Sequence, residues 1–214
     1  MFIHKIFSKI SPVFRNKRFQ QFLDVIKPSK TDRILDVGGY PFIWTSHEPC
    51  AKSVDVLNIH EFHFDPAEAP HHKIQPVMGN GCDLVYPDDS YEIVFSNSVI
   101  EHVGTWENQL SFAKEMRRVG KRLWIQTPAF EFFIEPHYIA PFLHWLPRNV
   151  RRHFLRYFTI WGWSHKPNKQ QVNEMLEEIR LISYSEMRKL FPDCDIIKER
   201  WLGIMTKSYV AVRL

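Results

Sequence analysis

The sequence predicts an α/β fold in which a mostly parallel sheet ends in an antiparallel hairpin. Three observations predict it: apolar runs of strand length recur through the first 126 residues, a helical pattern separates the last two of them, and two strand-like runs close the chain. A length of 214 residues with 44% hydrophobic residues suits a single globular domain with a sizeable core.

Five apolar runs are the expected parallel strands. They are Arg33–Val37, Ser53–Ile59, Ile74–Val77, Ile93–Ser96 and Arg122–Gln126. Between the last two, a helix is expected from a cap at Thr105 to Val119, because Leu110 and Ala113 have helical spacing and Gly120 follows. A strand, a helix and a strand in this order imply a right-handed parallel crossover.

The end of the chain has a different pattern. Ser185 is expected to cap a short helix, and Cys194–Leu202 and Lys207–Arg213 then form the two strands of a hairpin. Before them, residues 127–182 are rich in Pro, Trp, Phe and Arg. An insertion of this length in a compact domain is usually a lid or a binding loop.

Charge is unevenly distributed. Residues 1–33 carry eight basic and two acidic side chains, and residues 136–173 carry six basic and none acidic, whereas the segment between them is acidic. The basic segments are expected to face an anionic substrate or surface, with solvated helix faces as the alternative. The three cysteines lack metal-ligand spacing, and no apolar run is long enough for a membrane span or a secretory signal. These features predict a cytoplasmic protein.

The clearest chemical signal is the strand Arg33–Val37, which runs directly into Gly38-Gly39. In an open α/β sheet, ligands bind at the carboxyl ends of the strands, and glycine there lets the backbone approach a ligand closely. Three later segments follow in a fixed order. They are Asn80-Gly81-Cys82-Asp83-Leu84, Asp88–Ser96 and Val99–Val103.

With these motifs the chain resembles the class I S-adenosylmethionine-dependent methyltransferases, specifically the type 11 family, which includes the ubiquinone and menaquinone C-methyltransferases. The resemblance implies a Rossmann-like fold, the cofactor S-adenosylmethionine and methyl transfer. It covers the cofactor-binding core, residues 33–128 and 183–214. Residues 1–32 then form a basic amphipathic N-terminal segment, and residues 129–182 form a substrate lid.

The resemblance also implies the positions that contact the cofactor. The residues of the first motif lie beside the methionine part of the cofactor. Tyr40 and Phe42 stand where the family usually has two further glycines, so the helix that follows should be short. Asn58 is favoured over Asp55 as the ribose acceptor, and Asp83 is an alternative to Asn80 at the adenine. The full set is Asp36, Gly38, Gly39, Asp55, Asn58, Asn80, Gly81, Cys82, Asp83 and Ser96.

Three ionisable residues are candidates for catalysis. His102 follows the fourth strand, and a histidine titrates near neutrality, so it can remove a proton from a hydroxyl or amine during methylation. Glu135 and His137 are the ionisable pair among the aromatic residues of the insertion. They can supply acid–base chemistry or bind a polar substrate group. No third ligand at recognisable spacing joins them, so no metal site is predicted.

The dense aromatic residues of the insertion predict a pocket for a small-molecule, lipid-linked or glycan-linked acceptor. Residues 148–158 read as a helix with Val150, Phe154, Tyr157 and Phe158 on one side and Arg148, Arg151, Arg152 and Arg156 mostly elsewhere. Such a helix suits either the protein's own core or peripheral membrane contact, as does the N-terminal segment. The sequence does not determine the oligomeric state.

Two alternatives remain. The spacing Asp36-x-Gly38-x-x-Pro41-x-x-Trp44 is similar to that of the heat-shock type RNA 2′-O-methyltransferases, but the catalytic tetrad of that family is not visible, which disfavours a nucleic-acid substrate. The replaced glycines also permit a protein that binds a ligand or partner without catalysis.

Overall fold

A computed structural model of the chain describes residues 16–214. The predicted N-terminal amphipathic pattern of Phe2, Ile3, Ile6, Phe7 and Ile10 therefore lies outside the described residues. Residues 16–26 are helical, and Phe19, Phe22 and Ile26 are buried on one side of this helix. The rings of Phe19 and Phe22 pack edge-on against Trp44, which anchors the helix to an aromatic core.

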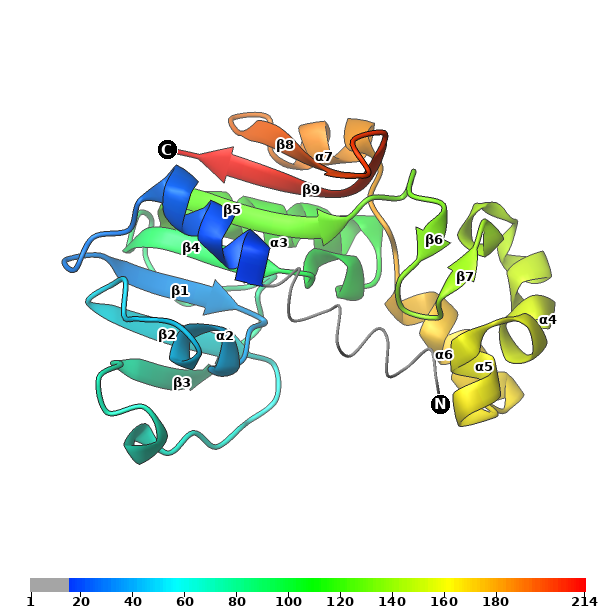
Figure 1. Cartoon of the computed structure of the whole chain (residues 1–214), viewed down its shortest axis with the longest axis horizontal. Coiled ribbons are helices and arrows are strands. Elements are labelled where there is room, and N and C mark those ends of the chain that lie inside the picture. The colour runs from blue at the N-terminus through cyan, green and yellow to red at the C-terminus, as the bar shows by residue number, and fades with distance from the viewer. Residues whose placement is uncertain (1–15) are drawn as a thin grey trace. The chain divides into compact units, whose positions relative to one another are not determined.

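Seven strands form one sheet in the order β3-β2-β1-β4-β5-β9-β8 (Figure 1). β1 pairs in parallel with β2 and β4, and β2 pairs in parallel with β3. The chain order reverses between β1 and β4, which is the topological switch point where open α/β sheets bind ligands. The strands are β1 Arg33–Val37, β2 Ser53–Asn58, β3 Ile74–Met78, β4 Tyr91–Asn97, β5 Gly120–Pro128, β8 Asp195–Trp201 and β9 Met205–Arg213.

All seven predicted strands are therefore present, with ends that differ by at most two residues. A second, two-stranded sheet pairs β6, Ile134–Glu135, with β7, Ala140–Pro141, in antiparallel register. The helices are α2 Phe42–Thr45, α3 Trp106–Val119, α4 Arg148–Phe158, α5 Ile160–His165, α6 Lys169–Glu178 and α7 Tyr184–Leu190. As expected, α2 is short and α3 ends at Val119. None of the helices within residues 16–214 is both long and apolar enough to cross a bilayer.

Two local predictions were wrong. Ser183, not Ser185, caps α7, because Ser183 and Glu186 form a capping box in which each side chain binds the other's backbone N–H. In α3, Leu110 is 43% exposed, although its spacing predicted an apolar face. Gln109 is buried beside it because its side-chain amide donates to the carbonyls of Ile100 and Arg180.

By contacts, the chain forms two compact units. Among the described residues, the first unit comprises residues 16–97, 114–125 and 212–214, and it holds β1 to β4. The second unit comprises residues 98–113 and 126–211, and it holds the whole predicted insertion.

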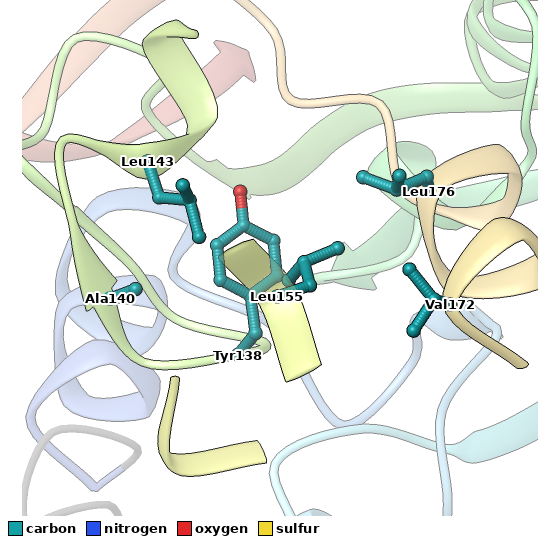
Figure 2. Close-up of a cluster of buried hydrophobic side chains, with 6 residues drawn as sticks. All are labelled: Tyr138, Ala140, Leu143, Leu155, Val172 and Leu176. Atoms are coloured by element: carbon teal, nitrogen blue, oxygen red, sulfur yellow. The ribbon is translucent and has the colours of Figure 1, made fainter. Parts of the chain in front are cut away.

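The insertion contains a hydrophobic core of its own. Figure 2 shows the ring of Tyr138 between Leu143 and Leu155. Val172 and Leu176, both from α6, complete this cluster with Ala140. α4 buries only Leu155, so the apolar side chains predicted on one side of this helix are exposed. They are Val150, Phe154, Tyr157 and Phe158.

Candidate functional site

The two glycines after β1 make a tight turn at the switch point. Gly38 has φ of +79°, a left-handed conformation, and its N–H donates to the carbonyl of Leu57 over 2.7 Å. At Gly39, an added Cβ would lie 2.0 Å from a carboxylate oxygen of Asp36. The turn therefore has no room for a side chain on the inner side of Gly39.

Asp36 points into the interior beneath this turn. It is 1% exposed, and Trp44 of α2 donates its indole N–H to Oδ2 over 2.7 Å. The other oxygen, Oδ1, is buried and has no hydrogen-bond partner among the described residues. Burial raises the pKa of Asp36 to about 7, against the lowering effect of the Trp44 hydrogen bond. Sequence reasoning noted the spacing from Asp36 to Trp44 but missed this bond, for which the spacing was the only signal.

Asn58 lies beside the glycine turn, as expected for the last residue of β2. Its amide donates to the carbonyl of Gly39 over 3.3 Å, and its oxygen accepts from the N–H of His60 over 3.3 Å. Ser96 is buried near the end of β4, where its hydroxyl donates to the carbonyl of Val37. The fold thus brings Asn58 and Ser96 to the strand ends at which the predicted cofactor contacts cluster.

Asp55 lies elsewhere. Its carboxylate accepts a hydrogen bond of 2.6 Å from the Tyr91 hydroxyl, and it lies 3.6 Å from the Arg33 guanidinium. Arg33 and Tyr91 are the first residues of β1 and β4. Asp55 is therefore held toward the amino ends of the strands, and the fold does not bring it to the glycine turn.

The residues after β3 form a compact turn. Asn80 accepts from the N–H of Cys82 through its side chain and from the N–H of Asp83 through its carbonyl. Gly81 lies within this turn, and Asp83 is exposed. The turn follows Gly79, whose N–H donates to the carbonyl of Asn58, so it continues from the same end of the sheet.

The side chains that replace the family's glycines do not fill the loop. Tyr40 and Phe42 are 59% and 65% exposed. Tyr40 contacts the ring of Phe62 at 5.5 Å between centroids. Ile59, which follows Asn58, is also exposed. The first unit therefore presents apolar surface on the loops that follow β1 and β2.

The three predicted catalytic residues come together in the second unit. Buried Glu135, on β6, accepts hydrogen bonds from the backbone N–H groups of His137 and Tyr138 through Oε2. Its Oε1 lies 2.5 Å from Nδ1 of His137. The Nε2 atoms of His137 and His102 lie 3.0 Å apart, and Nδ1 of His102 lies 3.4 Å from the Glu178 carboxylate.

We call His102 and His137, with Glu135 and Glu178, the histidine cluster. Its electrostatics shift the pKa values of the two imidazoles in opposite directions. Burial alone would lower the pKa of His137, but the hydrogen bond to Glu135 and the charges of Glu135, Glu101 and Glu178 raise it. The pKa of His102 is lowered, by burial first and then by the positive charge of His137. The pair therefore favours one charged and one neutral ring.

Glu101 lies beside this cluster as a fifth ionisable group, and the sequence pattern did not connect it to Glu135 and His137. It is fully buried, and its Oε2 accepts from the Thr127 hydroxyl over 3.0 Å. Glu101, His102 and His137 each offer one ligand atom, all within 4.8 Å of one another. Within residues 16–214 this is the one group of three such side chains that can hold a metal ion. Residues 101 and 137 lie so far apart in the sequence that no short ligand-spacing motif predicts this group.

A cavity of about 560 Å³ lies in the second unit. Its wall includes Glu135, Arg151 and Lys189. His144 also lines it, and its Nε2 lies 2.9 Å from the carbonyl of Phe130. Burial lowers the pKa of His144, against the opposing effect of that carbonyl. Nδ1 of His144 and Nε of Arg151 are both buried, and neither has a hydrogen-bond partner within residues 16–214.

The chain is similar to known methyltransferases in part of its sequence and in its fold. Residues 49–123 match the model of a methyltransferase domain, type 11. No curated protein matches the chain. The YcgJ protein of Bacillus subtilis is similar in structure, with a TM-score of 0.57 and 15% identity over 85% of this chain and 70% of that one.

Two archaeal structures are also similar. The protein PH0226 of Pyrococcus horikoshii has a TM-score of 0.52 and 14% identity over 98% of this chain and 89% of its own. A SAM-dependent methyltransferase of Methanosarcina mazei has a TM-score of 0.50 and 15% identity over 86% and 92%. The match to the methyltransferase domain covers residues 49–123 and so begins after the glycine turn that follows β1. The chain has the fold of these solved structures, and its residues 49–123 are similar to a type 11 methyltransferase domain.

Proposed function

We propose that this methyltransferase acts on an anionic acceptor, either a small molecule or a lipid-linked or glycan-linked group, bound in the cavity of the second unit. The observation that carries the proposal is the cationic part of the cavity wall, Arg151 and Lys189. The wall also contains Arg180 and Glu186, which pair with each other and so leave no excess charge. Glu135 has both oxygens engaged by His137 and backbone N–H groups.

S-adenosylmethionine would be held by the first unit. Gly38 and Gly39 place no side chain on the turn, and Asn58 and the Asn80 turn lie at the neighbouring strand ends. The buried Oδ1 of Asp36 has no hydrogen-bond partner in the part of the chain that the structure describes, which fits an arrangement that an ammonium group completes, directly or through water. Asp55 is left out, because Tyr91 and Arg33 hold it at the other end of the strands.

The cofactor supplies a methyl group activated on a sulfonium, so the protein has mainly to bind, orient and desolvate the acceptor. Glu135 lines the cavity and contacts His137, which in turn contacts His102. We therefore assign the contact with the acceptor's reacting group to these two histidines beside the cavity. Glu135 is a positioning residue, because it fixes the Nδ1 side of His137 through a 2.5 Å contact.

The experiment compares two neighbouring arginines of α4. Arg151 lines the cavity, whereas Arg152 is exposed and does not. With radiolabelled S-adenosylmethionine and a panel of carboxylate, phosphate and neutral acceptors, the wild-type protein is expected to methylate anionic compounds. Arg151→Gln should raise KM for them about tenfold or more, with Arg152→Gln near the wild type. Equal turnover of neutral and anionic acceptors would remove the charge argument.

If the acceptor is lipid-linked, we expect the protein to bind the membrane surface peripherally. α4 exposes Phe154, Tyr157 and Phe158 next to Arg152 and Arg156, a combination that suits an anionic lipid surface. Cosedimentation with vesicles of phosphatidylglycerol is the test. Binding should fall as salt rises and fall again in an Arg152→Ala, Arg156→Ala variant. Equal binding to neutral phosphatidylcholine vesicles would contradict an electrostatic contact.

The RNA alternative gains no specific support. The spacing from Asp36 to Trp44 that suggested it belongs to a buried hydrogen bond between the two side chains. A methyltransferase assay with RNA in place of the anionic panel would detect that activity directly.

A further inference from the structure

Two imidazole rings meet edge to face in the second unit with their Nε2 atoms 3.0 Å apart. His102 ends the 3-10 helix Ile100–His102, and His137 follows β6, so the fold joins them across 35 positions of sequence. Two ring nitrogens this close need something between them, because two lone pairs repel each other. A proton or a metal ion can fill that role.

The distance suits a metal ion. Two nitrogens that each lie about 2.0–2.1 Å from one zinc ion are about 3.0 Å apart when they subtend slightly more than 90° at the metal. Opening to the tetrahedral angle moves them to about 3.3–3.4 Å, a shift of a few tenths of an ångström. Small side-chain rotations therefore suffice to convert the observed pair into a pair of ligands.

The outer nitrogens of both rings are already held by carboxylates. Nδ1 of His137 lies 2.5 Å from Glu135, and Nδ1 of His102 lies 3.4 Å from Glu178. Histidine ligands of metals usually donate their second ring N–H to a carboxylate or carbonyl, which fixes the tautomer and turns the other nitrogen toward the ion. Here both rings have this support, and both Nε2 atoms turn toward the same point.

A third ligand comes from Glu101. A carboxylate oxygen of this fully buried residue lies within 4.8 Å of the ligand nitrogens of both histidines. Two imidazoles and one carboxylate form a donor set typical of zinc and other divalent first-row ions, and unlike the all-oxygen sets of calcium and magnesium. The carboxylates of Glu135 and Glu178 lie beside the two histidines and add negative charge around a cation.

We propose that Glu101, His102 and His137 form a site for a divalent first-row transition ion, with zinc as the first candidate. Three protein ligands leave a coordination position for water or for an oxygen or nitrogen of a bound molecule. The proposal does not depend on the cofactor assignment. It uses the two histidines assigned above to the acceptor's reacting group, so a bound ion would make that contact in place of the ring nitrogens.

The test measures metal binding by the full chain without cofactor or acceptor. After treatment with a chelator, calorimetric titration with zinc chloride should give one equivalent with a dissociation constant of about 1 µM or tighter. Cobalt chloride should give visible absorption bands from the bound ion. His102→Ala and His137→Ala should each weaken zinc binding more than about 100-fold, and Glu178→Gln less, because it changes only an outer partner.

His153→Ala is the matched control, since His153 is exposed on α4 and its Nδ1 lies 2.7 Å from the carbonyl of Asn149, away from the proposed ligands. It should bind zinc like the wild type. Glu101→Gln keeps the size of the side chain and tests the third ligand if an alanine variant fails to fold. Binding of S-adenosylmethionine, assigned to residues of the first unit, reports folding of each variant and separates this proposal from the cofactor site.

Two results would overturn the metal site. One is the absence of a stoichiometric zinc equivalent in the wild-type protein, in which case the two rings share a proton and remain candidates for general-base catalysis. The other is zinc binding that is unchanged in the folded His102→Ala and His137→Ala variants, which would assign the ion to another part of the chain.

Discussion

Trp44 donates its indole N–H to the buried carboxyl group of Asp36 over 2.7 Å, and no donor from residues 16–214 reaches the other oxygen of that group. A lone hydrogen bond does not compensate for the loss of water around a carboxylate, so the pKa rises from 3.8 to about 7. This relationship makes the folding stability depend on pH.

The first prediction concerns that dependence. Asp36 binds its proton more tightly in the folded than in the unfolded chain. Its contribution to the free energy of unfolding is therefore fully favourable below about pH 4, decreases as the pH rises, and levels off above about pH 7. Asp36→Asn, which cannot ionise, should remove this loss and gain a few kcal/mol relative to the wild type between pH 4 and 8. Urea unfolding of both proteins across this range measures it. A constant difference between the two proteins would contradict the raised pKa.

The second prediction concerns the glycine turn. Gly38→Val should weaken binding of S-adenosylmethionine about tenfold or more in calorimetry, because valine disfavours the left-handed backbone and would obstruct the approach of a ligand. Gly203→Val is the control, since Gly203 also has a left-handed backbone and no atom of the described residues lies within 4 Å of an added Cβ there. It should lose some stability and keep the affinity. A folded Gly38→Val protein with wild-type affinity would refute this placement of the cofactor.

A third prediction separates the two candidates for the ribose contact. Asn58→Ala should reduce the affinity for S-adenosylmethionine, because Asn58 ends β2 beside the turn. Asp55→Asn should leave the affinity unchanged and lower the free energy of unfolding by about 1–3 kcal/mol, because it disturbs the bond with Tyr91. Calorimetry and urea unfolding of the two variants distinguish these effects. The reverse pattern would restore Asp55 as the ribose acceptor.

The fourth prediction tests the core of the insertion. Leu155 is fully buried in the cluster of Figure 2, so Leu155→Ala should destabilise the protein by about 2–5 kcal/mol. Phe158→Ala, in the same helix, removes a larger but exposed side chain and should change the stability by less than about 1 kcal/mol. Thermal unfolding of both variants checks the contrast. Similar losses would mean that the exposed face of α4 is covered in solution.

The strands and the order of the motifs could be predicted from the sequence, because apolar runs and the residues that end them are local patterns of a few residues. The Ser183 cap could also be predicted in principle, since the Ser-x-x-Glu pattern is local, but Ser185 was chosen in its place. Leu110 was mispredicted because spacing alone does not say that a glutamine takes the buried place by binding two carbonyls.

The site was only partly predictable for a different reason. The position of Asn58 followed from its place at a strand end, whereas the inward turn of Asp36 depends on the approach of Trp44 after the short helix α2. The contact between His102 and His137 depends on tertiary folding, and no spacing rule connects residues 35 positions apart.

Glu135 also links two properties that engineers often wish to change separately. One of its oxygens accepts from the backbone of both His137 and Tyr138, and Tyr138 packs in the hydrophobic cluster of the insertion. A substitution that reshapes the cluster to admit a bulkier substrate will therefore shift the backbone that orients His137. Changing acceptor specificity through Leu143 or Leu155 calls for compensating changes that keep Tyr138 in place, so selection for a new substrate should recover mutations in pairs.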